Sequence, residues 1–185
     1  MNILDIKVKQ NHLIFREMLL GGHPNSLGRT IEVVDIILSD SSRLEELFNC
    51  YSSRDEVVRL RTSNAMKRIC KVQKTWLLPY IDRLLSQVSQ IEQASAQWTL
   101  AQLLNQLDEF LSQKQREQAK IALKINLTAY SDWIVLNATM ETLAKWSKSD
   151  SELKDWFKPY LAKLSEDKRK SVSSRAIKIT KQLNY

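Results

Sequence analysis

Apolar residues recur in four segments of the chain with the period of an α-helix. When Val58, Ala96, Val135 and Val172 are each set as position zero, the segments are spaced by 38, 39 and 37 residues. Positions 0, 4, 7, 8 and 11 of each segment fall on one stripe when successive residues are 100° apart. Sixteen of these twenty residues are apolar and the other four are threonine. The pattern predicts four helices with one buried face each, at about 55–72, 93–107, 132–148 and 169–184.

A short motif indicates that each of these helices has a partner helix before it. The segment from Trp76 to Leu84 recurs from Trp156 to Leu164 with the same Trp, Pro, Tyr and Leu positions, an offset of 80 residues or two periods of 40. A repeat of this length is typical of stacked helix pairs. The predicted first helices lie at about 42–51, 76–89, 112–129 and 151–165, preceded by helices at about 28–39 and 11–20.

Polar residues at the expected helix starts agree with these boundaries. Two pairs have the spacing of a capping box, namely Ser42 with Glu45 and Ser112 with Gln115. An acidic residue precedes three of the second helices, where it suits the positive end of the helix dipole, namely Asp55, Asp132 and Asp167. Prolines Pro79 and Pro159 are placed where a first helical turn tolerates a missing donor.

Composition supports an all-α fold. The chain has 185 residues with three glycines, none of them after Gly28, and three prolines, which are too few turn residues for hairpins. No run approaches eighteen apolar residues and the first residues lack the pattern of a secretory signal, so we expect no membrane span and a cytoplasmic location. Cys50 and Cys70 fall within helical pattern, which favours reduced core residues.

No motif for chemistry is recognisable in the chain. There is no glycine-rich phosphate loop, no His-Glu-x-x-His and no Cys-x-x-Cys. The two histidines, His12 and His23, lie near the N-terminus, far in sequence from the cysteines. These patterns predict a protein that is not an enzyme and that has no metal and no cofactor.

Asp55-Glu56-Val57-Val58-Arg59, followed by Ala65 and Ile69, resembles the second-helix signature of HEAT repeats. The other three segments match the period and the stripe but not the full motif. The resemblance implies a right-handed α-solenoid of about four helix pairs over residues 41–185, with the segment 1–40 supplying an N-terminal capping helix in one structural domain. It also implies that Asp55 and Arg59 tie neighbouring repeats together, and that the second helices line a concave surface.

The net charge of +7 is concentrated in two places. Six basic residues lie in and just after the first of the four stripe helices and six in the last segment, so that the rest of the chain sums to −5. Positions 2, 6, 9 and 13 lie opposite the stripe, and on a concave face they would be basic at both ends and polar in the middle. From these positions and the basic cluster we predict a partner-binding set: Arg61, Asn64, Lys67, Lys71, Trp98, Gln102, Asn105, Lys178 and Lys181.

Within that set, Trp98 is the predicted anchor, because a large aromatic residue at position 2 points away from the stripe. Two simpler interpretations stay open, namely that Trp98 belongs to the core and that the lysines serve solubility. The sequence favours a non-catalytic scaffold that binds a protein partner. The alternatives are a nucleic-acid-binding protein that uses the basic helices and, less favoured, a HEAT-like DNA glycosylase.

Overall fold

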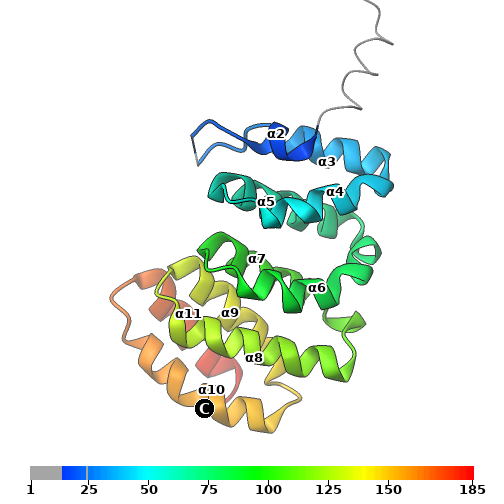
Figure 1. The fold of residues 1–185 in the computed structure, drawn as a ribbon. Helices are drawn as coiled ribbons and strands as arrows, with labels where there is room; N and C mark the ends of the chain where they lie inside the picture. The colour runs from blue at the N-terminus through cyan, green and yellow to red at the C-terminus, as the bar shows by residue number, and fades with distance from the viewer. Residues whose placement is uncertain (1–13, 24) are drawn as a thin grey trace, which may run out of the picture. The chain divides into compact units, whose positions relative to one another are not determined.

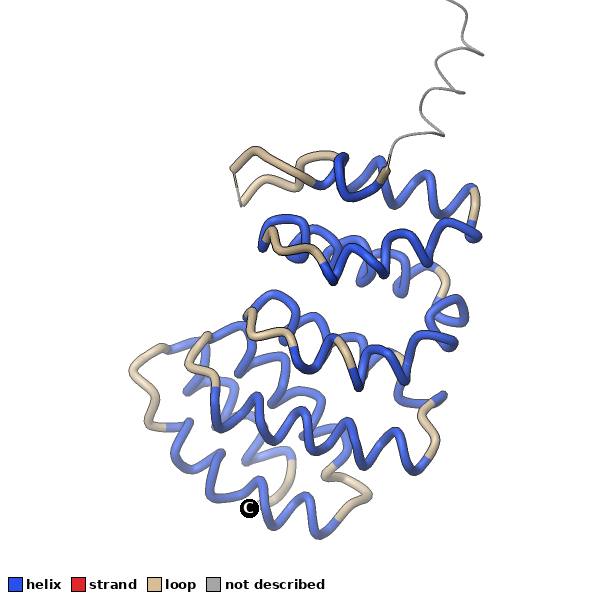
Figure 2. Tube along the Cα trace, in the orientation of Figure 1, coloured by secondary structure: helices blue, strands red, loops and turns tan. Residues whose placement is uncertain are grey.

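The computed structural model describes residues 14–23 and 25–185. Helices and the turns between them account for this part of the chain, which contains no strand (Figures 1 and 2). The described residues include no helix with the length and hydrophobicity of a membrane span. The chain divides into two compact units, Met1–Trp76 and Leu77–Tyr185, a boundary that the sequence pattern does not reveal.

The first unit is a small bundle around one long helix, α5 (Glu56–Val72). It also contains α2 (Phe15–Leu19), α3 (Thr30–Ser39) and α4 (Leu44–Asn49), with 3-10 turns at Ser41–Arg43 and Cys50–Ser52. Helices α2, α3 and α4 all contact α5. The helix predicted at 28–39 is therefore α3, which packs on α5 in this unit. Of the helix predicted at 11–20, residues 14–20 are described and 15–19 of these are helical, while 11–13, with His12, lie outside the described residues.

The second unit contains three helix pairs. The pairs are α6 (Ile81–Ser86) with α7 (Ala94–Gln106), α8 (Gln113–Ala129) with α9 (Trp133–Trp146), and α10 (Ser151–Ser165) with α11 (Lys170–Gln182). Three 3-10 segments complete the path: Lys74–Tyr80, which crosses the unit boundary, Val88–Gln90 and Asp108–Phe110. The second helices pack side by side, α7 on α9 and α9 on α11, while α6 contacts α8 (Figure 1).

The predicted apolar stripe is the buried face of the second helices. Nineteen of the twenty stripe residues are buried, and Thr180 is half-buried. Burial of aliphatic side chains at about 25 cal/mol per Å² is the main stabilising contribution to such a packing. Three of the four threonines fit this environment because their hydroxyls bond to a carbonyl one turn earlier: Thr62 to Val58 at 2.8 Å, Thr142 to Ala138 at 3.1 Å and Thr180 to Ala176 at 2.9 Å.

Most of the predicted helix starts are confirmed. Ser112 and Gln115 form a capping box: the Ser112 N–H donates to Gln115 Oε1 at 3.0 Å, and the Gln115 N–H donates to Ser112 Oγ at 3.2 Å. Asp55 and Asp132 each accept two backbone N–H groups at the start of α5 and α9. Asp167 accepts from the N–H of Arg169 at 2.8 Å, but this residue precedes α11, which begins at Lys170 without a side-chain cap. The capping residue predicted at Ser42 is wrong, because Asp40 accepts from the Ser42 N–H and starts that turn.

Candidate functional site

Arg61 was predicted as a partner-binding residue, but its side chain is buried in the first unit. Only 2% of the residue is exposed. Its guanidinium donates to the carbonyls of Leu19, Gly21 and Ser26 at 2.8, 2.6 and 3.1 Å. Gly28 has a positive φ of 51°, and a Cβ there would lie 2.8 Å from Arg61 Cζ. Arg61 therefore holds the connection between α2 and α3, which periodicity alone could not reveal.

The other predicted residues of the first unit lie along α5 with decreasing burial. Asn64 is half-buried and its Oδ1 accepts from Arg68 Nε at 2.7 Å. Lys67 is half-buried too, and burial lowers its pKa, helped by the charge of Arg68. Lys71 is exposed. Of the four predicted residues on α5, only Lys71 is fully available to a partner.

The predicted residues on α7 are not exposed either. Trp98, Gln102 and Asn105 are all half-buried, and no residue of α7 is exposed. The reason lies in its composition, because thirteen residues without a single charge form a helix that is buried around most of its circumference. Trp98 is therefore partly covered by protein, whereas the prediction placed it free in solvent. Asn105 makes a structural contact, since its Nδ2 donates to Thr142 Oγ1 at 3.3 Å.

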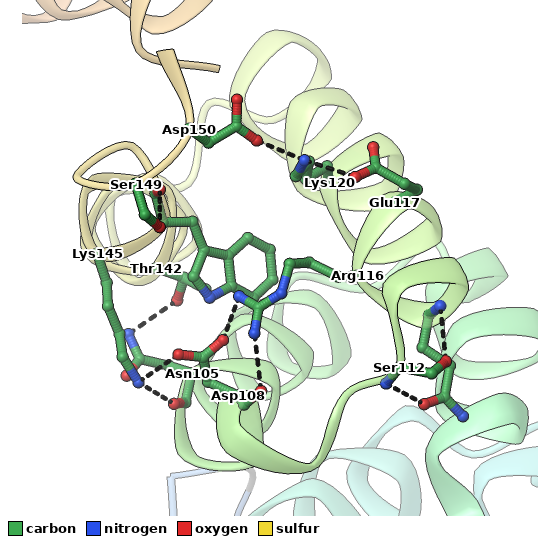
Figure 3. A network of polar contacts seen from close by, with 12 residues as sticks. Asn105, Asp108, Ser112, Arg116, Glu117, Lys120, Thr142, Lys145, Ser149 and Asp150 are labelled. Carbon is green, nitrogen blue, oxygen red and sulfur yellow. Dashed lines mark hydrogen bonds and ion pairs between the residues drawn. The ribbon is translucent and has the colours of Figure 1, made fainter. Parts of the chain in front are cut away.

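A polar network joins the end of α7 to α8 and α9 (Figure 3). Asp108 pairs with Arg116 and, at 3.0 Å, with Lys145 Nζ, which also donates to the Asn105 carbonyl at 3.1 Å. The Arg116 guanidinium lies 5.3 Å above the buried ring of Trp146. Burial raises the pKa of Asp108, but Lys145 and Arg116 outweigh it and hold the pKa below its ordinary value. The charges of Asp108, Arg116 and Lys145 offset one another, which indicates a structural role.

The same network continues to the start of α10. Lys120 Nζ lies 2.5 Å from an oxygen of Asp150, the N-cap of α10, and 2.7 Å from Glu117 (Figure 3). Burial lowers the pKa of Lys120, but these two carboxylates outweigh it and raise the pKa above its ordinary value. A cavity of about 710 Å³ lies among these residues, but each of its three cations is already paired with a carboxylate.

A second depression of about 180 Å³ lies between α9 and α11, on the side of the second helices. We call it the basic groove, and its lining residues are Glu141, Ala144, Lys145, Lys148, Arg175, Lys178, Ile179 and Gln182. Glu141 pairs with Arg175 across the groove. Lys148 and Lys178 are exposed and have no carboxylate partner among the described residues. Unpaired cations from α11 and from the turn after α9 therefore meet in the basic groove.

The basic groove contains only one member of the predicted binding set, Lys178. Lys181 is exposed on the same helix but lines a different depression, with Lys158 and Tyr185. Lys145 and Arg175 were missed, because they occupy positions 10 and 3 of their segments and lie at the edges of the face opposite the stripe. A wider angular window around positions 2, 6, 9 and 13 would have included them.

No group of three or more potential metal ligands occurs among the described residues. Comparison with known proteins gives no match to any family model, curated protein or solved structure. The function is therefore argued from the residues and their geometry.

Proposed function

We propose that the chain is a non-catalytic scaffold of HEAT-like helix pairs that binds a protein partner on the side of its second helices. The observation that supports this most is the arrangement of the second unit. Its second helices α7, α9 and α11 pack side by side, and the unpaired cations of the basic groove come from α11 and from the turn after α9. Stacked repeats of this kind generate extended surfaces that suit a partner better than a small molecule.

The charged residues of α9 and α11 are also the feature that would suit a nucleic acid. One detail favours a protein instead. No aromatic residue lines the groove, whereas proteins that bind single strands usually offer rings for base stacking.

The glycosylase alternative gains no support from its candidate residues. The Asp132 carboxylate is engaged as the N-cap of α9, with bonds of 2.8 and 3.0 Å. Trp146 is buried under Arg116, and Trp156 stacks on Tyr160 with their ring centroids 4.4 Å apart. Each of these residues has a structural explanation in the packing of the second unit.

Photo-crosslinking in cells of the native source tests the proposal. A photoreactive amino acid is placed at Ser174, which is exposed on α11, and in a matched control at Lys163, which is exposed on α10. We expect discrete protein adducts from Ser174 that are absent from Lys163. Adducts with nucleic acid would support the alternative function, and equal or absent protein adducts at both positions would contradict the scaffold proposal.

A further inference from the structure

The chemistry of the basic groove restricts the kind of segment that fits it. Its walls carry four cations, two from α9 and the turn that follows it and two from α11, against one carboxylate. Lys145 is held by Asp108 and Arg175 by Glu141, so these two cations are partly neutralised. Lys148 and Lys178 are left to attract an anion from solvent. An occupant should therefore bring negative charge to both walls.

The floor of the groove differs from its walls. Ala144 on α9 and Ile179 on α11 line it, and both are almost fully buried. A site with an apolar floor and charged rims selects a ligand with an apolar group between charged ones. A short aliphatic side chain covering Ala144 and Ile179 would bring its sequence neighbours to the level of Lys148 and Lys178.

We propose that the basic groove binds an extended acidic segment of a partner protein, in which acidic residues flank an aliphatic one. The inference rests on the proposed scaffold function and names the chemistry of its partner. The carboxylates would pair with Lys148 and Lys178, and the aliphatic side chain would cover the floor. Glu141 is the one group in the groove that opposes such a ligand, because it neutralises Arg175 and repels an incoming acid.

This role for Glu141 allows a test with effects of opposite sign. The probe is a fluorescein-labelled peptide of alternating glutamate and leucine, and its affinity for the full chain is measured by fluorescence anisotropy. The double variant Lys148→Glu, Lys178→Glu should weaken binding by at least about tenfold, because two attractions become repulsions. Glu141→Gln should strengthen binding by about threefold, since it frees Arg175 and removes a repulsion.

Controls separate the groove from general charge attraction. Lys163→Glu changes an exposed cation on α10, outside the groove, and should leave the affinity within about a factor of two. The same peptide with glutamine in place of glutamate should bind at least tenfold more weakly, by the same arithmetic. Circular dichroism and a thermal melt of every variant show whether the fold is kept.

Each possible result supports or contradicts the acidic-segment proposal, the scaffold proposal or both. Failure of the acidic peptide to bind, or equal weakening by Lys163→Glu, overturns the acidic-segment proposal. The scaffold function then still stands if Ser174 gives protein adducts in cells, so the two failures can be told apart. If a DNA or RNA oligonucleotide of matched charge binds more tightly than the peptide and loses affinity in the Lys148→Glu, Lys178→Glu variant, the groove is a nucleic-acid site and both proposals are wrong.

Discussion

Replacing Arg61 with methionine is expected to destabilise the first unit strongly, although the sequence pattern groups this residue with surface cations. Methionine keeps much of the side-chain volume but removes the guanidinium. The carbonyls of Leu19, Gly21 and Ser26 then lose their donors, and the connection between α2 and α3 loses its contact with α5. The substitution therefore tests whether the buried bonds, rather than the bulk of the side chain, hold this region.

The magnitude follows from the three shortest bonds. A hydrogen bond to a charged group contributes about 1.5–3 kcal/mol, so three of them would sum to several kcal/mol. Part of this is recovered, because residues 20–23 and 25–28 are exposed and water can reach the freed carbonyls of Gly21 and Ser26. The Leu19 carbonyl stays buried without a donor, so we expect a net loss of about 3–5 kcal/mol. Lysine at the same position should restore only part of the lost stability, because an ammonium group cannot reproduce the planar, forked set of N–H donors of the guanidinium.

Urea denaturation gives the free energy of unfolding, and hydrogen exchange of peptides covering residues 14–39 localises the change to the first unit. Arg68→Met on the same helix is the matched control, since Arg68 is exposed and should cost less than about 0.5 kcal/mol. If Arg61→Met unfolds with the same free energy as the Arg68→Met control, or if exchange rises only in the second unit, the assigned role of Arg61 is refuted.

Three further substitutions test other parts of the structure, each by urea denaturation. Ser112→Ala removes half of the capping box of α8 and should cost about 1 kcal/mol. Asp108→Asn should lower the free energy of unfolding by about 1 kcal/mol at neutral pH and by almost nothing in strong acid. The reason is that a group with a lowered pKa stabilises the fold above its unfolded pKa and loses this effect as pH falls through its folded pKa. Equal losses at both pH values would disprove the ion-pair account. Trp98→Ala should cost about 2 kcal/mol, less than the 3–5 kcal/mol of a fully buried tryptophan, and a cost near zero would return Trp98 to the surface.

The helices could be predicted from the sequence because burial on one face leaves a periodic trace. The helix predicted at 55–72 is observed at Glu56–Val72, and the one predicted at 151–165 is observed with those bounds. Periodicity records which side of a helix is apolar, and it says nothing about contacts of the opposite side. Arg61 illustrates this limit, since its partners lie 35 to 42 residues away in an irregular connection.

The candidate site was harder to predict for a related reason. A position that faces away from the apolar stripe need not face solvent, as α7 shows. Its thirteen residues carry no charge, and none of them is exposed. Charge at the outward positions predicts exposure better than angular position alone, because Lys148 and Lys178 are exposed while Trp98 is half-buried. The basic groove depends on the packing of α11 against α9, a contact that the sequence pattern does not specify.

The repeated motif shows how far a shared sequence determines local structure. Pro79 lies in the 3-10 segment Lys74–Tyr80, before α6, whereas Pro159 lies inside the continuous helix α10 and not in its first turn as predicted. The buried positions are nevertheless the same, since Leu77 corresponds to Phe157 and Ile81 to Leu161, and all four are buried. The motif therefore preserves which side chains are buried, while the backbone around the proline differs between its two copies.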